Sequence, residues 1–257
     1  MFAVLVAGLG LFGLVIGSFL NVVIYRVPRG ESIVAPRSRC PACGTTLRAT
    51  DNIPVVSFIA LRGRCRSCHA PISVQYPIVE VLTACLFAAT AARFGFAWPL
   101  PAFVVLSAGL VALATIDVER QILPKVIVYV VTALVAVLLV VAAATTDDWR
   151  RLLIALACAA VWFGVFFVIH AASPESLGFG DVRLVFVLGL ALGWLGIGYV
   201  LAGLFVASFI GGVVGIGLIA TKRASLTTRL SFGPFLTLGA EIVVFAGSAI
   251  LSPFHGI

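Results

Sequence analysis

Charged side chains are scarce in this sequence. Asp, Glu, Lys and Arg together make up 11% of its 257 residues, whereas 62% of the residues are hydrophobic and the mean hydropathy is +1.20. Soluble domains carry about 25% charged residues, so this composition excludes an ordinary soluble domain and indicates an integral membrane protein in the lipid bilayer. The formal charge of +7 does not indicate nucleic-acid binding, because the basic residues lie beside apolar segments, where orientation in the membrane explains them.

The first apolar segment also lacks the features of a cleaved signal peptide. No charged region precedes it, and Arg26 follows it where a signal peptide would have a small-residue cleavage site. We therefore expect this segment to be retained as a membrane span.

Apolar runs of span length recur along the whole chain. They cover residues 2–25, 75–92, 97–116, 126–144, 152–172, 184–198, 199–220 and 232–251. The predicted fold is an all-α polytopic membrane protein with about eight transmembrane helices and a small cytoplasmic loop domain after the first helix.

The predicted chain therefore has three segments. Residues 1–25 form the first transmembrane helix, residues 26–74 form the loop domain, and residues 75–257 form a seven-helix membrane domain. The sixth and seventh apolar runs are short, and residues 193–198 (Gly-Trp-Leu-Gly-Ile-Gly) are typical of a tight turn with an interfacial Trp between them.

The basic residues predict the orientation in the membrane. With eight spans, the loops at 26–74, 117–125, 173–183 and 221–231 share one side, and this side holds 14 of the 17 Lys and Arg residues. By the positive-inside rule it is the cytoplasmic side, which puts both chain termini outside.

Two aspartates lie at span ends on this predicted cytoplasmic face. Asp117 ends the third span and Asp181 opens the sixth. An ionised carboxylate costs about 2.5–3.5 kcal/mol at the centre of a membrane helix, so acids within spans indicate a functional site. Residues 178–181 are Gly-Phe-Gly-Asp, and we expect Gly178 and Gly180 to let the backbone turn sharply and another backbone approach.

The predicted chemistry is that of a paired-carboxylate hydrolase. Two carboxylates held close together cannot both ionise easily, so one keeps its proton as the acid while the other activates water as the base. We therefore expect Asp117 and Asp181 to form a catalytic pair. The sequence does not assign the acid and base separately, and the alternative is that each acid merely lies at a helix end.

Four cysteines in the loop predict a metal site. Cys40 and Cys43 form one CxxC pair and, after 21 intervening residues, Cys65 and Cys68 form another. This spacing is typical of a zinc ribbon, in which four thiolates form a closed tetrahedral site; two disulfides are the alternative, which a reducing cytoplasm disfavours. Because a closed site leaves no position for water, we expect the zinc to be structural and His69 to be a bystander.

Other polar residues within spans give weaker signals. Ser18 and Asn21 are expected to bond to a neighbouring helix. Glu80, near the cytoplasmic end of the second span, either supports the site or lies in the interface, and Glu241 in the last span needs a partner that the sequence does not name.

These residues resemble those of the prepilin peptidases, also called type IV leader peptidases. This is a family of intramembrane aspartic proteases with a Gly-x-Gly-Asp motif, and the resemblance runs over nearly the whole chain. The matching motifs lie at residues 17–26, 39–43, 52–57, 61–68, 71–73, 76–80, 116–124, 178–181 and 232–236.

The resemblance implies an activity and its partners. Such enzymes remove the short basic leader from type IV prepilins, or from the pseudopilins of type II secretion, at the cytoplasmic face of the bacterial inner membrane. The resemblance implies that Asp117 and Asp181 are catalytic and that the four loop cysteines bind zinc. It also implies N-methylation of the new N-terminus with S-adenosylmethionine, although the sequence shows no Gly-rich fingerprint for that donor.

The motif residues around the pair are expected to support it. They are Gly178, Gly180, Arg183 and Glu80. Arg183 departs from the Lys that many relatives carry two residues after the motif Asp, which keeps the charge but replaces an ammonium with a forked guanidinium.

Three alternatives stay open at this point. The chain is a peptidase without methyltransferase activity, an ion-coupled transporter that uses Asp117 and Asp181, or a scaffold that docks a partner through its zinc loop. Against transport, the two acids lie at one face rather than near the midplane, and no internal repeat is visible.

Overall fold

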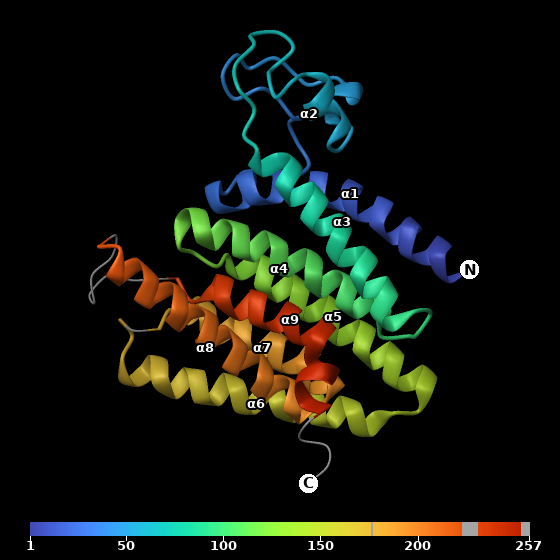
Figure 1. The fold of residues 1–257 in the computed structure, drawn as a ribbon, viewed down its shortest axis with the longest axis vertical. Helices are drawn as coiled ribbons and strands as arrows, with labels where there is room; N and C mark the ends of the chain where they lie inside the picture. The colour runs from blue at the N-terminus through green and yellow to red at the C-terminus, as the bar shows by residue number, and fades with distance from the viewer. Residues whose placement is uncertain (176, 223–230, 253–257) are drawn as a thin grey trace. The chain divides into compact units, whose positions relative to one another are not determined.

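A computed structural model describes residues 1–175, 177–222 and 231–252 of the protein (Figure 1). Within these ranges every named element is a helix, and β-structure is limited to two isolated bridges in the loop after the first helix. The chain forms two compact units, Met1–Phe96 and Ala97–Ile257. The three segments expected from the sequence stay a prediction.

All eight apolar runs form long helices, which confirms the predicted all-α fold. The first unit contains α1 (Phe2–Arg26), η1 (Val27–Arg29), η2 (Ala49–Asn52), α2 (Val56–Ala60) and α3 (Gln75–Phe94). The second unit contains α4 (Leu100–Arg120), α5 (Lys125–Thr146), α6 (Trp149–Ala172), α7 (Phe179–Leu195), α8 (Ile197–Ala220) and α9 (Gly233–Leu251).

Seven of these long helices are long and apolar enough to cross a membrane, which makes the chain an integral membrane protein. The eighth, α7, has 17 residues. At 1.5 Å per residue it extends about 26 Å, somewhat less than the hydrocarbon core of about 30 Å. It contacts α4, α5, α6, α8 and α9 within its unit, so protein covers much of its surface.

The predicted turn between the sixth and seventh runs is present, and its Trp is buried within the protein. Gly196 has φ 133°, a conformation that favours glycine, and it separates α7 from α8. Trp194 is only 3% exposed. Its ring packs among the helices, because α7 is buried on most sides.

Glycines let the two long helices of the first unit approach closely. Gly13 and Gly17, one turn apart on α1, face α3. A Cβ built at Gly13 would lie 2.7 Å from the Cα of Ala84, and one at Gly17 would lie 2.6 Å from the Cα of Glu80. Because real Cβ atoms never come this close, these glycines set the α1–α3 separation, as small-xxx-small motifs do in membranes.

Glycines also allow close approach of the helices in two helix pairs of the second unit. On α7, a Cβ built at Gly189 would lie 2.9 Å from the Cα of Ala159, and one at Gly193 would lie 2.8 Å from the Cα of Ala155, both on α6. On α9, a Cβ at Gly239 would lie 2.6 Å from the carbonyl oxygen of Gly203 and 2.8 Å from the amide nitrogen of Ala207, both on α8. The pairs α6–α7 and α8–α9 lie side by side in Figure 1.

Replacing Gly17 with Val should destabilise the first unit. The new side chain would press on the backbone of α3, and overpacking of this kind typically costs about 1–3 kcal/mol. Gly8→Val is the matched control, because a Cβ at Gly8 on the same helix has no neighbour within 4 Å in the part of the chain that the structure describes. Thermal unfolding in detergent should show a lower Tm for Gly17→Val than for Gly8→Val. Equal Tm values would contradict the proposed close packing.

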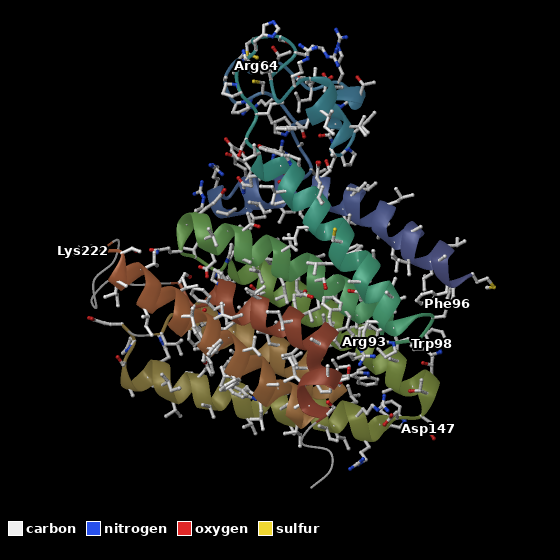
Figure 2. The ribbon with its side chains drawn as sticks, viewed as in Figure 1. Arg64, Arg93, Phe96, Trp98, Asp147 and Lys222 are labelled. Carbon is white, nitrogen blue, oxygen red and sulfur yellow. The ribbon has the colours of Figure 1, made fainter. Side chains whose placement is uncertain are left out.

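The loops of the second unit lie at its two ends. In Figure 2, Trp98 before α4 and Asp147 between α5 and α6 lie at one end of this unit, and Lys222 after α8 lies at the other. The chain therefore crosses the unit with each long helix. Because α4 starts at the Trp98 end, the last turn of α4 and the first turn of α7 both belong to the Lys222 end.

Candidate active site and metal centre

Asp117 lies in the last turn of α4 and is 2% exposed. The helix ends just after it because Gln121 adopts a left-handed conformation with φ 54° and donates its N–H to the Asp117 C=O at 2.8 Å. The side chain of Ser231 donates a hydrogen bond to Asp117 Oδ2. This places the carboxylate beside the segment that leads into α9.

Asp181 lies in the first turn of α7 and is 8% exposed. A carboxylate in the first turn of a helix is favoured by the helix dipole. Asp181 donates its N–H to the Gly178 C=O at 3.1 Å, and its Oδ1 is buried without a hydrogen-bond partner among the described residues. A buried acceptor of this kind is available to a water molecule or a substrate.

The structure brings the segments that carry Asp117 and Asp181 together around the side chain of Leu123. Leu123 lies at their junction. A Cβ at Gly180, next to Asp181, would lie 2.9 Å from Leu123 Cβ, and a Cβ at Gly233 would meet both Leu123 Cδ1, at 3.3 Å, and Asp117 Oδ2. The glycines at 180 and 233 therefore make room for Leu123 and the Asp117 carboxylate.

The expected role of the motif glycines in a sharp turn is wrong. Gly178 has φ −69° and ψ 144°, an extended conformation that any residue adopts, and Gly180 is helical. The expected close approach is present at Gly180, but it involves the Leu123 side chain instead of another backbone. Sequence alone does not separate these two uses of glycine.

Arg183 does not form an ion pair with either aspartate. Its guanidinium lies over the ring of Phe179 at 4.4 Å and near that of Tyr129 at 5.7 Å. Its Nε is buried and without a hydrogen-bond partner in the ranges that the structure describes. The cation therefore does not neutralise either aspartate through an ion pair.

Glu80 contacts residues within the first unit. Its Oε2 accepts the N–H of Val55 at 2.7 Å, and its side chain also bonds to that of Ser18. Val55 has φ 60°, which a β-branched residue rarely adopts. Asn21 donates its side-chain N–H to the Tyr76 C=O at 3.1 Å. These bonds tie the loop and α3 to α1, as expected for Ser18 and Asn21.

The four loop cysteines come together in the first unit. Their sulfur atoms all lie within 4.8 Å of one another, and Cys40 Sγ is 3.8 Å from Cys68 Sγ. A tetrahedral zinc site with Zn–S bonds of about 2.3 Å requires sulfurs about 3.8 Å apart, so the cluster fits this metal. All six cysteines of the chain are free, in agreement with a metal site and not with two disulfides.

The two CxxC segments have the same local backbone. In each segment, the C=O of the first Cys accepts a hydrogen bond from the N–H of the residue four positions later. The N–H of the same Cys donates a hydrogen bond to the C=O of the residue five positions later. The bonds are Gly44 N–H to Cys40 C=O, Cys40 N–H to Thr45 C=O, His69 N–H to Cys65 C=O and Cys65 N–H to Ala70 C=O. His69 has φ 57° and occupies the position that Gly44 holds, with φ 72°, in the first segment.

Local hydrogen bonds lower the pKa of two thiols in this cluster, whereas the pKa of Cys68 is raised to about 12, because the lowering by the backbone amide of Ala70 is outweighed by the Cys43 side chain and burial. The Thr45 hydroxyl and then the Thr45 backbone amide lower the pKa of Cys43 to about 6. The backbone amides of Cys68 and then Ser67 lower the pKa of Cys65. Because thiolate is the form that binds metal, these donors favour the metal-binding form of Cys43 and Cys65.

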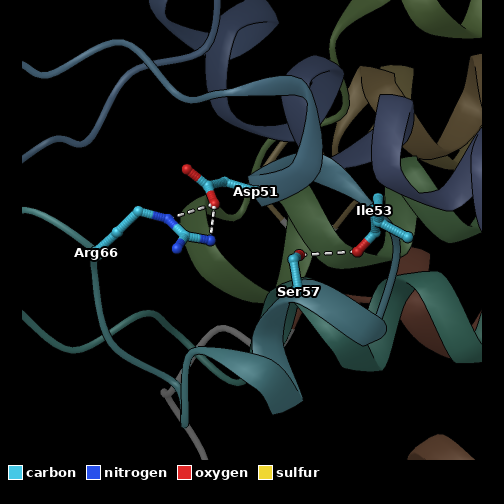
Figure 3. Close-up of polar contacts among 4 residues, drawn as sticks. All are labelled: Asp51, Ile53, Ser57 and Arg66. Carbon is cyan, nitrogen blue, oxygen red and sulfur yellow. Dashed lines mark hydrogen bonds and ion pairs between the residues drawn. The ribbon is translucent and has the colours of Figure 1, made fainter.

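An ion pair braces the second CxxC segment (Figure 3). Arg66 donates from Nε and Nη2 to Asp51 Oδ1 at 2.9 and 2.6 Å, and Ser57 donates its hydroxyl to the Ile53 C=O at 2.8 Å. The Arg66 side chain lowers the pKa of the Asp51 carboxyl through this hydrogen bond. The pair thus links the η2 segment to the segment that carries Cys65 and Cys68.

The sequence did not single out several residues that the structure places at these sites. Ser231 and Leu123 contact Asp117 or the glycines around the pair, and Asp51 pairs with Arg66. Ser231 directly precedes the motif at 232–236, which is the signal that pointed to this segment. Glu241 is 8% exposed, and neither of its oxygens has a clear hydrogen-bond partner in the described part of the chain, although it lies near Ser107.

Two models of known protein families match the chain, one within each of its two units. A family model described as the bacterial peptidase A24 N-terminal domain matches residues 11–94, and one described as the type IV leader peptidase family matches residues 104–216. No solved structure matches the chain.

Curated relatives cover most of the chain. A protein from Myxococcus xanthus is 45% identical over 84% of this chain, and the match spans 64% of that protein. Proteins from Pseudomonas aeruginosa and Bacillus subtilis are 31% and 34% identical over 93% and 94% of this chain and 90% and 94% of their own lengths. All three are named prepilin leader peptidase/N-methyltransferase.

The helices, the acid pair and these matches define a polytopic membrane peptidase. The chain belongs to the type IV leader peptidase family. The comparisons do not favour the ion-coupled transporter.

Proposed function

We propose that this protein removes the leader from type IV prepilins or pseudopilins and then methylates the new N-terminus. The observation that carries the peptidase proposal is that two buried aspartates, Asp117 and Asp181, lie at the same end of the second unit, on segments that pack around Leu123. Family membership supports the same activity, and the names of the relatives support the methyl transfer.

The pair supplies acid–base chemistry for peptide hydrolysis. One carboxyl group holds a proton while the other, as a carboxylate, removes a proton from water, and the resulting hydroxide attacks the carbonyl carbon of the scissile bond. The amide nitrogen then leaves with a proton from the pair. The Ser231 hydroxyl orients Asp117 through its hydrogen bond to Oδ2.

The substrate must present an open peptide bond to this pair. We propose that the apolar helix of the pilin lies along the spans while its basic leader stays in the cytoplasm. A helical carbonyl is already hydrogen-bonded, so the segment at the cleavage site has to unwind before attack. A site at the membrane surface also admits water.

The orientation in the membrane belongs to this proposal. The charge bias of the loops supports a cytoplasmic active site in the bacterial inner membrane, with both termini on the outer side. Lys222 lies at the same end of the second unit as the aspartates, as that orientation requires (Figure 2).

The two proposed cofactors, Zn²⁺ and S-adenosylmethionine, are supported by different observations. Cys40, Cys43, Cys65 and Cys68 would hold a structural Zn²⁺, which crosslinks the loop when bound. S-adenosylmethionine is proposed from the relatives' names alone. A pocket between α6, α7, α8 and α9 is lined by apolar residues such as Trp162, Leu188 and Leu192, and it does not fit a charged nucleoside, so we assign no residue to the donor.

Co-expression with a prepilin tests both activities. Intact mass should show loss of the leader peptide only when this protein is present, and a further gain of one methyl group if methylation follows. An unprocessed prepilin beside a well-inserted enzyme would contradict the peptidase proposal. Cleavage without added mass would leave a peptidase that lacks methyltransferase activity.

A further inference from the structure

Gly178 is a glycine that the fold itself does not require. Its φ of −69° and ψ of 144° suit any residue, and it is exposed at the start of α7. Among the described residues, a Cβ built on it would meet only Asp181 Oδ2, at 3.5 Å, and the Gly180 amide nitrogen, at 3.9 Å. Both are ordinary van der Waals distances, so a methyl group would fit without moving the protein.

The neighbouring glycines differ from Gly178 in this respect. At Gly180 a Cβ would lie 2.9 Å from Leu123 Cβ, and at Gly233 it would collide with the Asp117 carboxylate. Packing within the protein therefore explains Gly180 and Gly233. It leaves the open side of Gly178 unexplained.

The open side of Gly178 adjoins a buried acceptor. Asp181 is 8% exposed as a residue, and its Oδ1 is buried and has no partner in the ranges that the structure describes. Its Oδ2 is the atom nearest to the open side of Gly178. A group that reaches the carboxylate along this side passes a residue without a side chain.

The segment that carries Gly178 is held in place. His170 Nδ1, near the end of α6, donates a hydrogen bond to the Leu177 C=O at 2.7 Å, and its ring lies 5.3 Å from that of Phe179. The Phe179 ring in turn lies under the Arg183 guanidinium. Gly178 is therefore fixed on both sides, and its open face has a defined position relative to Asp181.

We propose that the open face of Gly178 is a binding subsite for the extended main chain of the substrate next to the scissile bond. The subsite rests on the proposed peptidase function and adds a contact surface to it. Gly178 is a glycine because a side chain would occupy the space that the substrate backbone needs to bring its carbonyl group to Asp181. An extended main chain is narrower than a helix and can lie against this subsite, which agrees with cleavage of a locally unwound helix.

The test compares substitutions at three glycines in the full-length protein. Gly178→Ala should insert at wild-type levels but lower kcat by about tenfold or more with little change in KM, because a misplacement of about 1 Å can cost about 10²-fold. Gly178→Ser is the second variant, since Ser caps a helix N-terminus better than Ala and removes any loss of capping. It should unfold at or above the wild-type Tm and still cleave slowly.

Two control variants separate the subsite from the fold. A Cβ at Gly164 in α6 meets no atom of the described residues within 4 Å, so Gly164→Ala should leave kcat and Tm unchanged. Gly180→Ala should lower the Tm, because it collides with Leu123. Kinetics use a purified prepilin in detergent, and Tm is measured in the same detergent.

The possible outcomes decide the proposal. Slow cleavage by both Gly178 variants at normal Tm supports the subsite. A cleavage rate within twofold of the wild type for either Gly178 variant overturns it. It is also overturned if both Gly178 variants lose as much Tm as Gly180→Ala does. Failure of the wild-type protein to cleave any prepilin would instead overturn the proposed function.

Discussion

Replacing either Asp117 or Asp181 with Asn should abolish leader cleavage. An Asn side chain has nearly the same shape but can neither accept the proton of the attacking water nor deliver one to the leaving amine. General acid–base catalysis contributes about 10²–10⁴-fold to a rate, and each variant should lose at least this much. Because the two carboxylates act together, the double variant should be no slower than the single ones.

The control for these variants is Asp147→Asn. Asp147 is exposed in the loop after α5 and adopts φ 53°, a conformation that Asn tolerates well. The measurement is prepilin cleavage by intact mass at matched amounts of membrane-inserted enzyme. Normal cleavage by Asp117→Asn or by Asp181→Asn would show that the pair is not the catalyst, and the scaffold hypothesis would then return.

Replacing Cys43 and Cys68 together with Ser should remove the zinc and unfold the loop between α1 and α3. Each CxxC segment would keep one sulfur, and two ligands do not close a tetrahedral site. The binding free energy of structural Zn²⁺ in zinc-finger peptides is about 10–16 kcal/mol and is in effect folding free energy. A loop of irregular backbone that loses it should become open to proteases.

Metal analysis and limited proteolysis check this expectation. The wild-type protein should hold one zinc per chain and resist cleavage within residues 30–74, whereas the double variant should lose both properties. Cys85→Ser is the matched control, because Cys85 lies on α3 outside the cluster. Full zinc content in the double variant would contradict a four-cysteine site. Prepilin cleavage in the same samples shows whether the folded loop is needed for activity.

The fold was largely predictable because apolar runs in a membrane protein have one structural solution, the helix. All eight runs appear as helices, and the spacing of the cysteines predicted a cluster that the loop does form. Because Asp117 ends the third predicted span and Asp181 opens the sixth, two complete spans separate them, and the sequence predicted both at the same end. These features depend on composition and spacing, which a sequence displays directly.

The parts that could not be predicted depend on contacts between distant segments. Ser231 reaches Asp117 across 114 residues, and Leu123 fills the space left by Gly180 and Gly233. The glycines show the difficulty most clearly. Gly17, Gly180 and Gly178 look alike in a sequence, yet a Cβ would press on a backbone at the first and on a side chain at the second, and would make only ordinary van der Waals contacts with the described residues at the third.

The close helix pairs also suggest an order of assembly during synthesis. α6 with α7 and α8 with α9 are neighbours in the chain, so each hairpin can form as soon as its second helix leaves the ribosome. The acid pair, in contrast, needs the end of α4, the start of α7 and the residue before α9. We therefore expect nascent chains to have no peptidase activity until nearly all of the protein has been inserted. Partly synthesised chains would then not cleave other membrane proteins.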